Sequence, residues 1–348
     1  WNRTVDKAQA AVGDLTDDIR AFDLDAVAGA LKAGDVVVSM LPGDWHVPLA
    51  KAAIAKGAHF VSSSYIAPEM RALDSAARAA GVRVINEVGL DPGIDHLMAH
   101  DLVRLYRESA AYDPDNHLSF TSYCGGVPKI ANAFRYKFSW APVGVLKALR
   151  SPSRSIRHYS ELNVAKPWDA ISRYDAPLDP PESFEVYPNR DSLPFMQDYG
   201  FDATWKVKDF VRGTLRLNGW AEAWAGIFAE VGSASDARLT EMAEGLLAEN
   251  AYGPEEPDRV VLCVALRAER DGVPVWHNEW VMDAWGDARS SAMARLVSVP
   301  VSLAVEAALA REVPAGVSAA PSDPRLVQRW MAEVDVLAQR LRRVDHLA

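Results

Sequence analysis

The run Asp35-Val36-Val37-Val38-Ser39-Met40-Leu41, followed by Pro42-Gly43, decides how this chain is expected to fold. Its apolar, β-branched residues are bounded by a charge on one side and by a Pro-Gly turn on the other. That pattern is typical of a short strand whose two faces are both buried. Because such strands occur in parallel sheets covered by helices, the run favours an α/β domain.

Helix-like and strand-like segments alternate after this run. The spacing predicts helices over residues 47–56 and 69–80, stopped by Gly57 and Gly81, and strands over residues 59–62 and 82–85. Alternation at such short spacing indicates a doubly wound parallel sheet, so we expect a Rossmann-type nucleotide-binding domain over residues 1–95. The sequence starts at Trp1 rather than at methionine, and we expect the first strand of this domain and its glycine-rich loop to precede it.

The texture of the sequence changes after Asp95, where aromatic residues, prolines and polar turns become frequent. This change predicts a second, α+β substrate domain with added helices over residues 96–313. Its predicted strands cover residues 118–123, 184–187 and 260–268, and its predicted helices cover residues 96–108, 222–249 and 288–311. We expect residues 314–348 to form a linker and a C-terminal helix, over residues 325–343, that packs back on the Rossmann domain.

The composition limits the classes of partner. A formal charge of -10 and a pI near 5.3, with no clustered basic face, argue against nucleic acid and anionic membranes and favour a small-molecule partner. The two cysteines, Cys124 and Cys263, match no disulfide framework and no zinc spacing, so we expect a reducing, cytoplasmic compartment and no metal site. No run approaches the roughly 18–20 uncharged apolar residues of a membrane span, so we expect neither membrane insertion nor export.

The segment Asn2-Arg3-Thr4 falls where a second Rossmann strand would end, if Trp1 is the last residue of that strand. A side chain at that position faces the adenine ribose, where arginine accommodates the 2′-phosphate of NADP and an acidic residue selects NAD. Arg3 and Thr4 therefore favour NADP, with NAD as the alternative. A plain helix N-cap at Thr4 fits equally well, because a helical run begins at Asp6.

Hydroxyl groups follow two of the predicted strands. Ser39 closes the first strand, and Ser62-Ser63-Ser64-Tyr65 ends the second. Dinucleotides lie at the carboxyl ends of parallel strands, where hydroxyls can bind a ribose or an amino-acid carboxylate. A serine-rich turn that caps the next helix fits the spacing as well. His46 begins a helix nearby, but a lone histidine is more often structural, so we do not place it in the site.

The most specific segment is Gly89-Leu90-Asp91-Pro92-Gly93-Ile94-Asp95-His96. Its two glycines and its proline fix the backbone course between the last predicted strand and a helix. Asp91 would then lie at the end of the sheet where chemistry takes place. An aspartate before Pro-Gly is also a frequent turn former, so the segment alone leaves its role open.

Further motifs complete a pattern that resembles the saccharopine dehydrogenase family. The motifs that carry the resemblance, in the family's order, are Val36-Val37-Val38-Ser39-Met40-Leu41-Pro42, Ser63-Ser64-Tyr65, Asn86-Glu87-Val88 with the segment from Gly89 to His96, Tyr123-Cys124-Gly125-Gly126, Tyr136-Lys137-Phe138-Ser139-Trp140, Tyr187-Pro188-Asn189-Arg190-Asp191-Ser192, Arg212-Gly213-Thr214-Leu215-Arg216 and Ser290-Ser291-Ala292-Met293-Ala294-Arg295-Leu296-Val297. The last three are similar to motifs of its NADP-dependent, glutamate-forming branch.

The resemblance implies an oxidoreductase of lysine metabolism. Its reaction would be the interconversion of L-saccharopine with L-glutamate and L-2-aminoadipate 6-semialdehyde, by hydride transfer between NADP(H) and a C–N bond. The family fold is a Rossmann domain followed by an α/β substrate domain with added helices.

The resemblance also implies the residues of the site. Substrate contacts would come from Ser64, Tyr65, Asp91, Arg190, Thr214, Leu215 and Arg216. Cofactor contacts would come from Asn2, Arg3, Thr4, Ser39, Ser63, Leu90, Asp91 and Pro92, with one more between Lys137 and Trp140. We expect Asp91 to be catalytic, by stabilising an iminium or orienting the secondary amine, and Tyr65 to be a weaker acid–base candidate.

Physical chemistry agrees with the two arginines of this set. Saccharopine carries three carboxylates, and a guanidinium binds a carboxylate bidentately, which suits Arg190 and Arg216; without the resemblance, structural salt bridges would be the better interpretation. Two alternatives stay open. One is an imine reductase for another amino-acid or polyamine adduct, and the other is a non-catalytic nucleotide-binding sensor. A homodimer is compatible with an enzyme of this kind.

Overall fold

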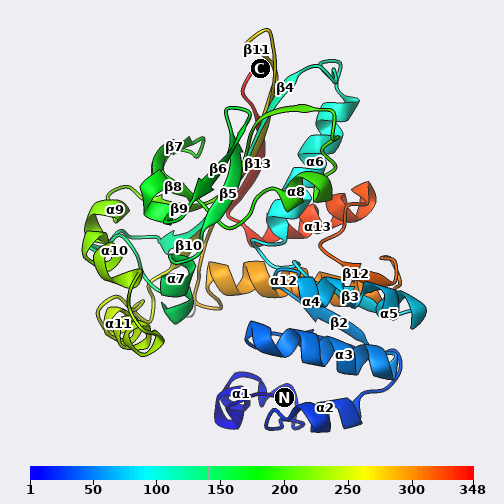
Figure 1. Ribbon diagram of the computed structural model, residues 1–348. Coiled ribbons are helices and arrows are strands. Elements are labelled where there is room, and N and C mark those ends of the chain that lie inside the picture. Colours follow the sequence, from blue (N-terminus) through cyan, green and yellow to red (C-terminus); the bar gives the residue numbers. More distant parts are fainter. Residues whose placement is uncertain (140–141) are drawn as a thin grey trace. The chain divides into compact units, whose positions relative to one another are not determined.

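The computed structural model describes residues 1–139 and 142–348 (Figure 1). Its contacts divide the chain into two units. The first unit contains Trp1–Gly93 and Val299–Pro321, and the second contains Ile94–Ser298 and Ser322–Ala348. Each unit therefore combines stretches that are distant in sequence.

A four-stranded sheet forms the centre of the first unit, in the order β1-β2-β3-β12. The strands are β1 (Val36–Ser39), β2 (His59–Ser62), β3 (Arg83–Ile85) and β12 (Gly316–Ser318). Every neighbouring pair is parallel; Val38, for example, lies opposite Val61. The predicted parallel sheet of an α/β domain is confirmed, and three of its strands lie where the sequence places them.

Short helices accompany this sheet. They are α1 (Val5–Val12), α2 (Leu24–Ala30), η1 (Gly43–Trp45), α3 (His46–Lys56), α4 (Pro68–Arg71) and α5 (Asp74–Ala79). α3 packs on β1 and β2, where Leu49 and Ala53 join a core that includes Phe60 and Val84. Gly57, with φ of 68°, ends α3 in the left-handed conformation, as predicted.

We expected one helix over residues 69–80, but the structure has α4 and α5 with a break before Asp74. The N–H of Leu73 donates to the carbonyl of Met70, three residues back, which tightens the turn. The Asp74 carboxylate accepts a hydrogen bond of 2.9 Å from the N–H of Val317 in β12. This tertiary contact positions α5, and the alanine-rich sequence carries no sign of it.

β12 lies inside the segment that we expected to be a linker. Its residues pair with β3, Gly316 opposite Arg83 and Ser318 opposite Ile85. Gly316 has a φ of +117°, a backbone conformation that favours glycine. Three residues are too few to show the periodicity of a strand, so the sequence did not reveal β12. As a result, Val299–Pro321 belongs to the first unit.

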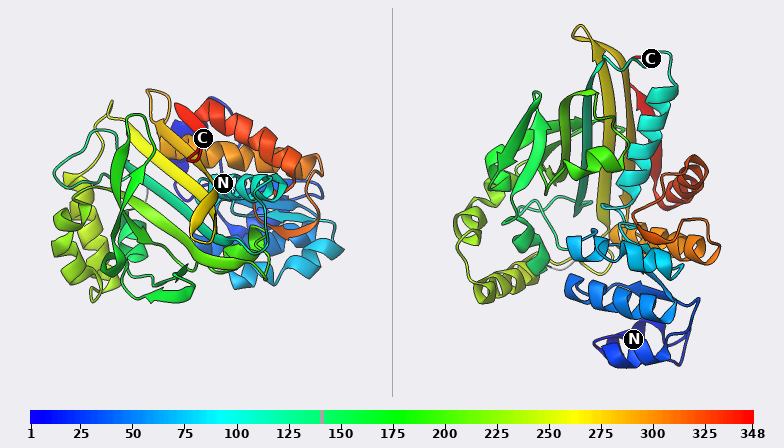
Figure 2. Two further views of the ribbon diagram at one scale, coloured as in Figure 1. Left: turned by 90° about the horizontal axis from the view of Figure 1, so that it is seen from above. Right: turned by 45° about the vertical axis from the view of Figure 1, so that its right-hand side comes forward.

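A mixed, nine-stranded sheet forms the second unit, in the order β13-β11-β10-β4-β9-β5-β6, with β7 and β8 paired beside β9 (Figure 2). Its strands are β4 (His117–Pro128), β5 (Ser153–Arg157), β6 (Ser160–Val164), β7 (Ser172–Ala176), β8 (Glu182–Pro188), β9 (Lys206–Leu217), β10 (Asp258–Arg270), β11 (Val273–Trp285) and β13 (Arg340–Asp345). β4 and β9 are parallel, and the other pairs are antiparallel. The predicted strands of the second domain are found within β4, β8 and β10.

The helices of the second unit include the predicted α6. They are α6 (Ile94–Glu108), α7 (Pro142–Ala148), η2 (Pro167–Ala170), α8 (Pro194–Asp198), α9 (Trp220–Ala223), α10 (Ala225–Val231), α11 (Asp236–Glu249) and α13 (Pro324–Leu337), while α12 (Ala292–Leu309) contributes to both units. The expected single helix over residues 222–249 is thus broken. One break follows Trp224, and the other ends at Ser235, whose side chain accepts a hydrogen bond from the N–H of Arg238 as the N-cap of α11.

The C-terminal segment differs from the prediction in two ways. α13 packs against α6 within the second unit, whereas we expected the terminal helix to pack on the Rossmann domain. The helix also ends at Leu337, and β13 then pairs antiparallel with β11. The edge of β11 offers a row of backbone hydrogen-bonding groups, and pairing with it outweighs the continued amphipathic pattern of the sequence.

One helix meets the length and composition of a membrane span, although we expected no such segment. α12 has 18 residues and a mean hydropathy of 1.5, and 44% of it is buried. It carries Arg295, whose guanidinium donates to the carbonyls of Leu337 and Trp285 at 2.9 and 2.8 Å. A single helix of this kind indicates little, because core helices of globular proteins share its length and composition.

Candidate functional site

The loop that follows β3 is held by contact between its two glycines. The N–H of Gly89 donates to the carbonyl of Pro92 at 2.9 Å. Gly93 has a φ of +148°, and a Cβ at this position would lie 2.1 Å from the carbonyl oxygen of Gly89. The predicted role of the glycines, to fix the backbone on both sides of Asp91, therefore has a structural basis.

Asp91 and Tyr65, the two expected catalytic residues, are in contact. The Tyr65 hydroxyl donates to Asp91 Oδ1 at 3.0 Å, and both side chains are partly buried. Tyr65 follows β2 and Asp91 follows β3, and these strands are parallel neighbours in the sheet. The arrangement holds a carboxylate and a phenol together at the carboxyl end of the sheet, where they can hold or move a proton.

Glu87 supports this pair, and the sequence did not single it out. Its carboxylate accepts a hydrogen bond of 2.8 Å from the N–H of Ile66, and its own N–H donates to the carbonyl of Ser64 at 3.1 Å. Glu87 is buried and has a φ of 54°. It ties the turn after β2 to the loop after β3. Its place in the Asn86-Glu87-Val88 motif could have drawn attention to it, but a glutamate in a loop is more often an ordinary surface or structural residue.

His46 bridges two of the predicted site residues, although we left it out of the site. Its Nδ1 lies 2.9 Å from Ser39 Oγ, and its Nε2 lies 2.9 Å from Ser64 Oγ. Burial lowers the pKa of His46 below its usual value, so the imidazole is neutral at neutral pH. A neutral ring donates from one nitrogen and accepts at the other, which orients both hydroxyls. The signal that could have found it is the adjacency of β1 and β2.

The serines after β2 divide between the two interpretations of that segment. Ser62 is fully buried, and its hydroxyl accepts a hydrogen bond of 3.1 Å from the N–H of Ser64, as in a serine-rich turn. Ser63 is partly exposed. Leu90 and Pro92 have buried side chains. Any contact that these last two make with a cofactor would come from their main chain.

The expected adenine-ribose residues lie at the start of the chain and are exposed. Asn2 forms a parallel bridge with Ala21, and its side chain accepts a hydrogen bond of 2.9 Å from the N–H of Thr4. Thr4 occupies the N-cap position of α1, but its side chain makes no capping hydrogen bond. Arg3 has no ion-pair or hydrogen-bond partner in the described part of the chain. Even if Thr4 serves as the N-cap, the Arg3 guanidinium remains exposed to solvent and can bind a phosphate.

In the second unit, Arg216 is buried inside an aromatic cage. Its guanidinium carbon lies 5.0 Å from the ring centre of Tyr136, 5.5 Å from that of Tyr187 and 5.4 Å from that of Trp220. It donates to the Tyr187 hydroxyl at 2.9 Å and to the carbonyl of Leu215 at 3.0 Å. All of these groups are neutral.

No carboxylate pairs with Arg216 among the described residues. Glu185 lies opposite Arg216 in the strand register, but its carboxylate accepts hydrogen bonds from the N–H groups of Gly219 and Ala221 at 2.9 and 2.7 Å. Within the same described part, Arg216 Nε has no hydrogen-bond partner. A buried charge without a counterion is costly, so this guanidinium is prepared for an anion.

The strand register decides what the other residues of this motif can do. Thr214 and Arg216 are two positions apart in β9 and share one face of the sheet, whereas Leu215 faces the opposite side. Leu215 is fully buried in the apolar core of the second unit. The side chain expected to touch substrate is therefore a core residue, and only Thr214 and Arg216 present side chains on the shared face.

Arg190 is exposed, at a residue with φ of 53° beside β8. Its carbonyl accepts a hydrogen bond of 2.9 Å from the N–H of Arg154, and Arg154 forms an ion pair of 2.6 Å with Asp191. This pair fixes the backbone around Arg190.

A buried ion pair next to the glycine motif was not predicted. Arg212 donates to Asp95 Oδ2 at 2.6 Å, and both side chains are almost fully buried. His96 Nδ1 lies 2.8 Å from the Tyr199 hydroxyl beside this pair. The network ties the start of α6 to β9.

The expected cofactor contact between Lys137 and Trp140 falls partly outside the described residues, because Trp140 is one of the two not described.

Comparison with known proteins assigns both parts of the chain to the family that the sequence motifs resemble. Residues 1–85 match the family model "Saccharopine dehydrogenase NADP binding domain", and residues 89–336 match "Saccharopine dehydrogenase C-terminal domain". The chain is 37% identical over 205 residues to the NADP(+), L-glutamate-forming saccharopine dehydrogenase of Pyricularia oryzae, a match that covers 58% of this chain and 44% of the relative. The corresponding enzyme of Saccharomyces cerevisiae is 35% identical over 235 residues, covering 63% of this chain and 49% of the relative. The chain thus spans about half the length of these two relatives.

Solved structures show the same fold. The apo saccharopine dehydrogenase (L-Glu forming) of S. cerevisiae superposes with a TM-score of 0.78 and 25% identity, covering 98% of this chain and 93% of that one. The NAD complex of a homospermidine synthase from Legionella pneumophila shares the fold at a TM-score of 0.62 and 10% identity, covering 99% and 83%. The resemblance seen in the sequence motifs is confirmed. The chain belongs to the saccharopine dehydrogenase family, and its first 85 residues match the NADP-binding domain of that family.

Proposed function

We propose that this protein is an NADP-dependent oxidoreductase that interconverts L-saccharopine with L-glutamate and L-2-aminoadipate 6-semialdehyde. Membership of the family and the names of the fungal relatives support the reaction class. The observation that carries the substrate is Arg216, a buried guanidinium surrounded by neutral groups. A carboxylate-rich secondary amine supplies the anion that this residue lacks.

The first unit carries several groups that suit NADP. Arg3 is exposed and without a partner among the described residues, which suits the 2′-phosphate that distinguishes NADP from NAD. Ser39 ends β1 and Ser63 follows β2 at the carboxyl end of the parallel sheet. Ser39 is buried against His46, whereas Ser63 is partly exposed and its hydroxyl can bind a ribose or the carboxamide. When bound, NADP(H) accepts or donates the hydride. The NAD alternative would leave Arg3 without a role.

The chain's own residues then act on the substrate and its proton. Arg216 and Thr214 bind and orient a carboxylate from one face of β9, and Arg190 reaches a second carboxylate from the surface. Asp91, held by the Tyr65 hydroxyl, orients the secondary amine and takes up the proton that the amine loses on oxidation. His46 fixes the Ser39 and Ser64 hydroxyls, which keeps that end of the sheet ordered.

The test is NADP reduction by the full-length protein with L-saccharopine, followed by absorbance and by mass-spectrometric identification of the products. The proposal expects L-glutamate and the semialdehyde in equal amounts, with NADP preferred over NAD. A panel of polyamine and amino-acid secondary amines tests the alternative substrates. Turnover of a polyamine adduct but not of saccharopine would show that the enzyme acts on a different secondary amine. Cofactor binding without turnover of any amine would support the sensor alternative.

We propose the cytoplasm as the location. Within the described residues, Cys124 and Cys263 are buried and form no disulfide bond, which suits a reducing compartment. The acidic balance of the chain supports small molecules, rather than nucleic acid or anionic membranes, as its partners.

A further inference from the structure

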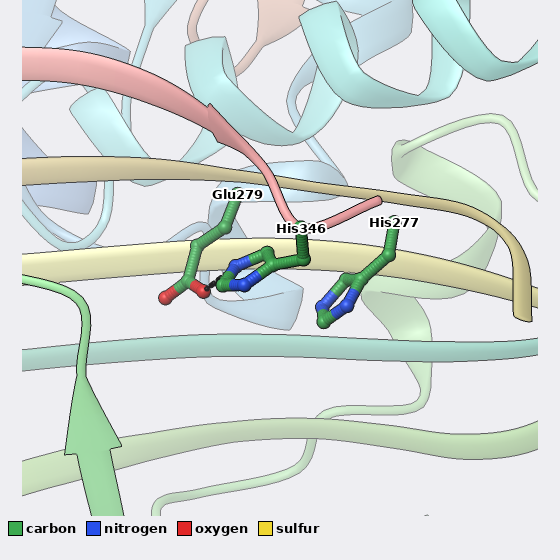
Figure 3. A group of neighbouring side chains, drawn as sticks. All are labelled: His277, Glu279 and His346. Carbon is green, nitrogen blue, oxygen red and sulfur yellow. Dashed lines mark hydrogen bonds and ion pairs between the residues drawn. The ribbon is translucent and has the colours of Figure 1, made fainter. Parts of the chain in front are cut away.

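Three potential metal ligands converge on one side of the sheet of the second unit. His277 and Glu279 belong to β11, and His346 follows β13 by one residue (Figure 3). One ligand atom from each side chain lies within 4.8 Å of the others. These residues take no part in the site described above.

The backbone places the three side chains together. His277 and Glu279 are two positions apart in a strand, so they project from the same face. In the antiparallel pairing of β11 with β13, Asn278 lies opposite Asp345, and the N–H of His346 donates to the carbonyl of His277 at 3.0 Å. His346 is therefore the cross-strand partner of His277. Regular strand geometry sets the positions of His277 and Glu279, and His346 continues the pairing one residue beyond β13.

Glu279 is a buried carboxylate held by two hydrogen bonds. It is 4% exposed, and it accepts hydrogen bonds from the Tyr174 hydroxyl and, at 2.8 Å, from His346 Nε2. His346 is its only ion-pair partner in the described part of the chain. A cation at this position would offset the cost of burying the carboxylate.

The two histidine rings lie against each other. They stack with centres 4.1 Å apart and planes 18° apart. His346 is partly exposed. Rotation of its ring about the Cβ–Cγ bond can turn a nitrogen toward an ion shared with His277, because that torsion is broad.

We propose that His277, Glu279 and His346 form a binding site for a transition-metal dication, with water completing the coordination. Two imidazoles and one carboxylate suit Zn²⁺, Co²⁺, Ni²⁺ or Cu²⁺, whereas Mg²⁺ and Ca²⁺ prefer sites built from oxygen alone. The bound ion would join β13 to β11 and so stabilise the edge of the sheet. Its role is structural, and it is independent of the proposed oxidoreductase activity.

The test is a calorimetric titration of the chelator-treated, full-length protein with ZnCl₂. We expect one saturable site in the wild type and a rise in melting temperature with ZnCl₂. His277→Gln and His346→Gln should each weaken binding by about tenfold or more, since even the outer partners of metal ligands change affinity by about 10- to 100-fold. The control is His158→Asn, which changes an exposed histidine in the left-handed conformation, tolerated by asparagine, and should bind as the wild type does.

Absorption of the Co²⁺ complex gives a second readout. A shared, low-coordinate site with nitrogen ligands should produce a strong visible band in the wild type and in His158→Asn, and His346→Gln should lose it. Melting curves without metal show whether each variant is folded. Absence of saturable Zn²⁺ binding in the wild type would overturn the proposal, as would equal Zn²⁺ affinity in folded His277→Gln, His346→Gln and wild type.

Discussion

Asp91 owes its position to the contact between Gly89 and Gly93, and its chemistry to the Tyr65 hydroxyl. The sequence motifs named all of these residues but could not measure their separation. They gave no role in the site to His46 and Glu87, which connect the predicted residues to each other. A single histidine or glutamate carries no periodic signal, so only the folded arrangement of β1, β2 and β3 reveals these connections.

Asp91→Asn should lower kcat for saccharopine oxidation by about 100-fold or more, because the amide cannot take up the amine proton. NADPH affinity should change by no more than about twofold, since asparagine keeps the size of the side chain. Stopped-flow turnover and fluorescence titration measure the two quantities. Tyr65→Phe is the matched variant and should have the smaller effect on kcat. Equal losses in turnover and in NADPH binding would make Asp91 a cofactor-binding residue only.

His46 should make stability depend on pH. Its folded-state pKa lies below the ordinary value of 6.5, so the unfolded chain binds the proton more readily. The contribution of neutral His46 to stability is then present above pH 6.5 and is lost as the pH falls below it. We therefore expect the free energy of unfolding of the wild type, minus that of His46→Gln, to decrease as the pH is lowered from about 8 to about 5.

Urea denaturation at several pH values measures this difference, with His158→Asn as the control. His158 is exposed and lies outside the site, so this variant controls for the loss of a histidine elsewhere in the chain. A difference for His46→Gln that is independent of pH would mean that the buried ring takes up its proton as easily as in the unfolded chain.

At the scale of elements, the sequence predicts best where a segment is long enough to show a period. β1, β2, β3, α3 and α6 all lie close to their predicted ranges. β12 has only three residues and lies in a turn-rich segment that was predicted to be a linker. The residues of β13 continue the amphipathic pattern of α13, so they were predicted to be helical. Both strands exist because an open sheet edge beside them offers hydrogen bonds, and such tertiary pairing cannot be seen in local composition.

Ser235 marks a break that the sequence could have shown. Its side chain caps α11 by accepting a hydrogen bond from the N–H of Arg238 at 3.2 Å. Ser235→Ala should lower the free energy of unfolding by about 1 kcal/mol, and Ser235→Asp should restore most of it. Thermal and urea denaturation measure the change. Equal stability of Ser235→Ala and the wild type would mean that residues 232–235 do not require the cap.

At the scale of the whole molecule, the predicted site residues divide between the two units. The expected cofactor residues from Asn2 to Pro92 and the Tyr65–Asp91 pair belong to the first unit, and Arg190, Thr214 and Arg216 belong to the second. Motifs identified both groups through resemblance, whereas the structure adds which side chains are accessible. Leu215 is the example, since its place in the motif suggested contact with substrate and its burial assigns it to the core.

The cluster formed by His277, Glu279 and His346 shows the opposite limit of sequence analysis. The cysteine spacing suggested no metal site, and the two histidines are separated by most of the last quarter of the chain. Only the pairing of β13 with β11 brings them together. Spacing rules detect ligands that are close in sequence, and a site made by strand pairing escapes them.

The most direct test of the account is kcat/KM for L-saccharopine in Arg216→Met, compared with the wild type and with Arg216→Lys. Loss of a charged hydrogen bond to a carboxylate should reduce kcat/KM by about 10- to 100-fold in Arg216→Met and by less in Arg216→Lys, with NADPH affinity unchanged in both. This result would establish Arg216 as a substrate carboxylate anchor. A folded Arg216→Met protein that oxidises saccharopine as the wild type does, or that loses NADPH affinity to the same extent as activity, would contradict the account.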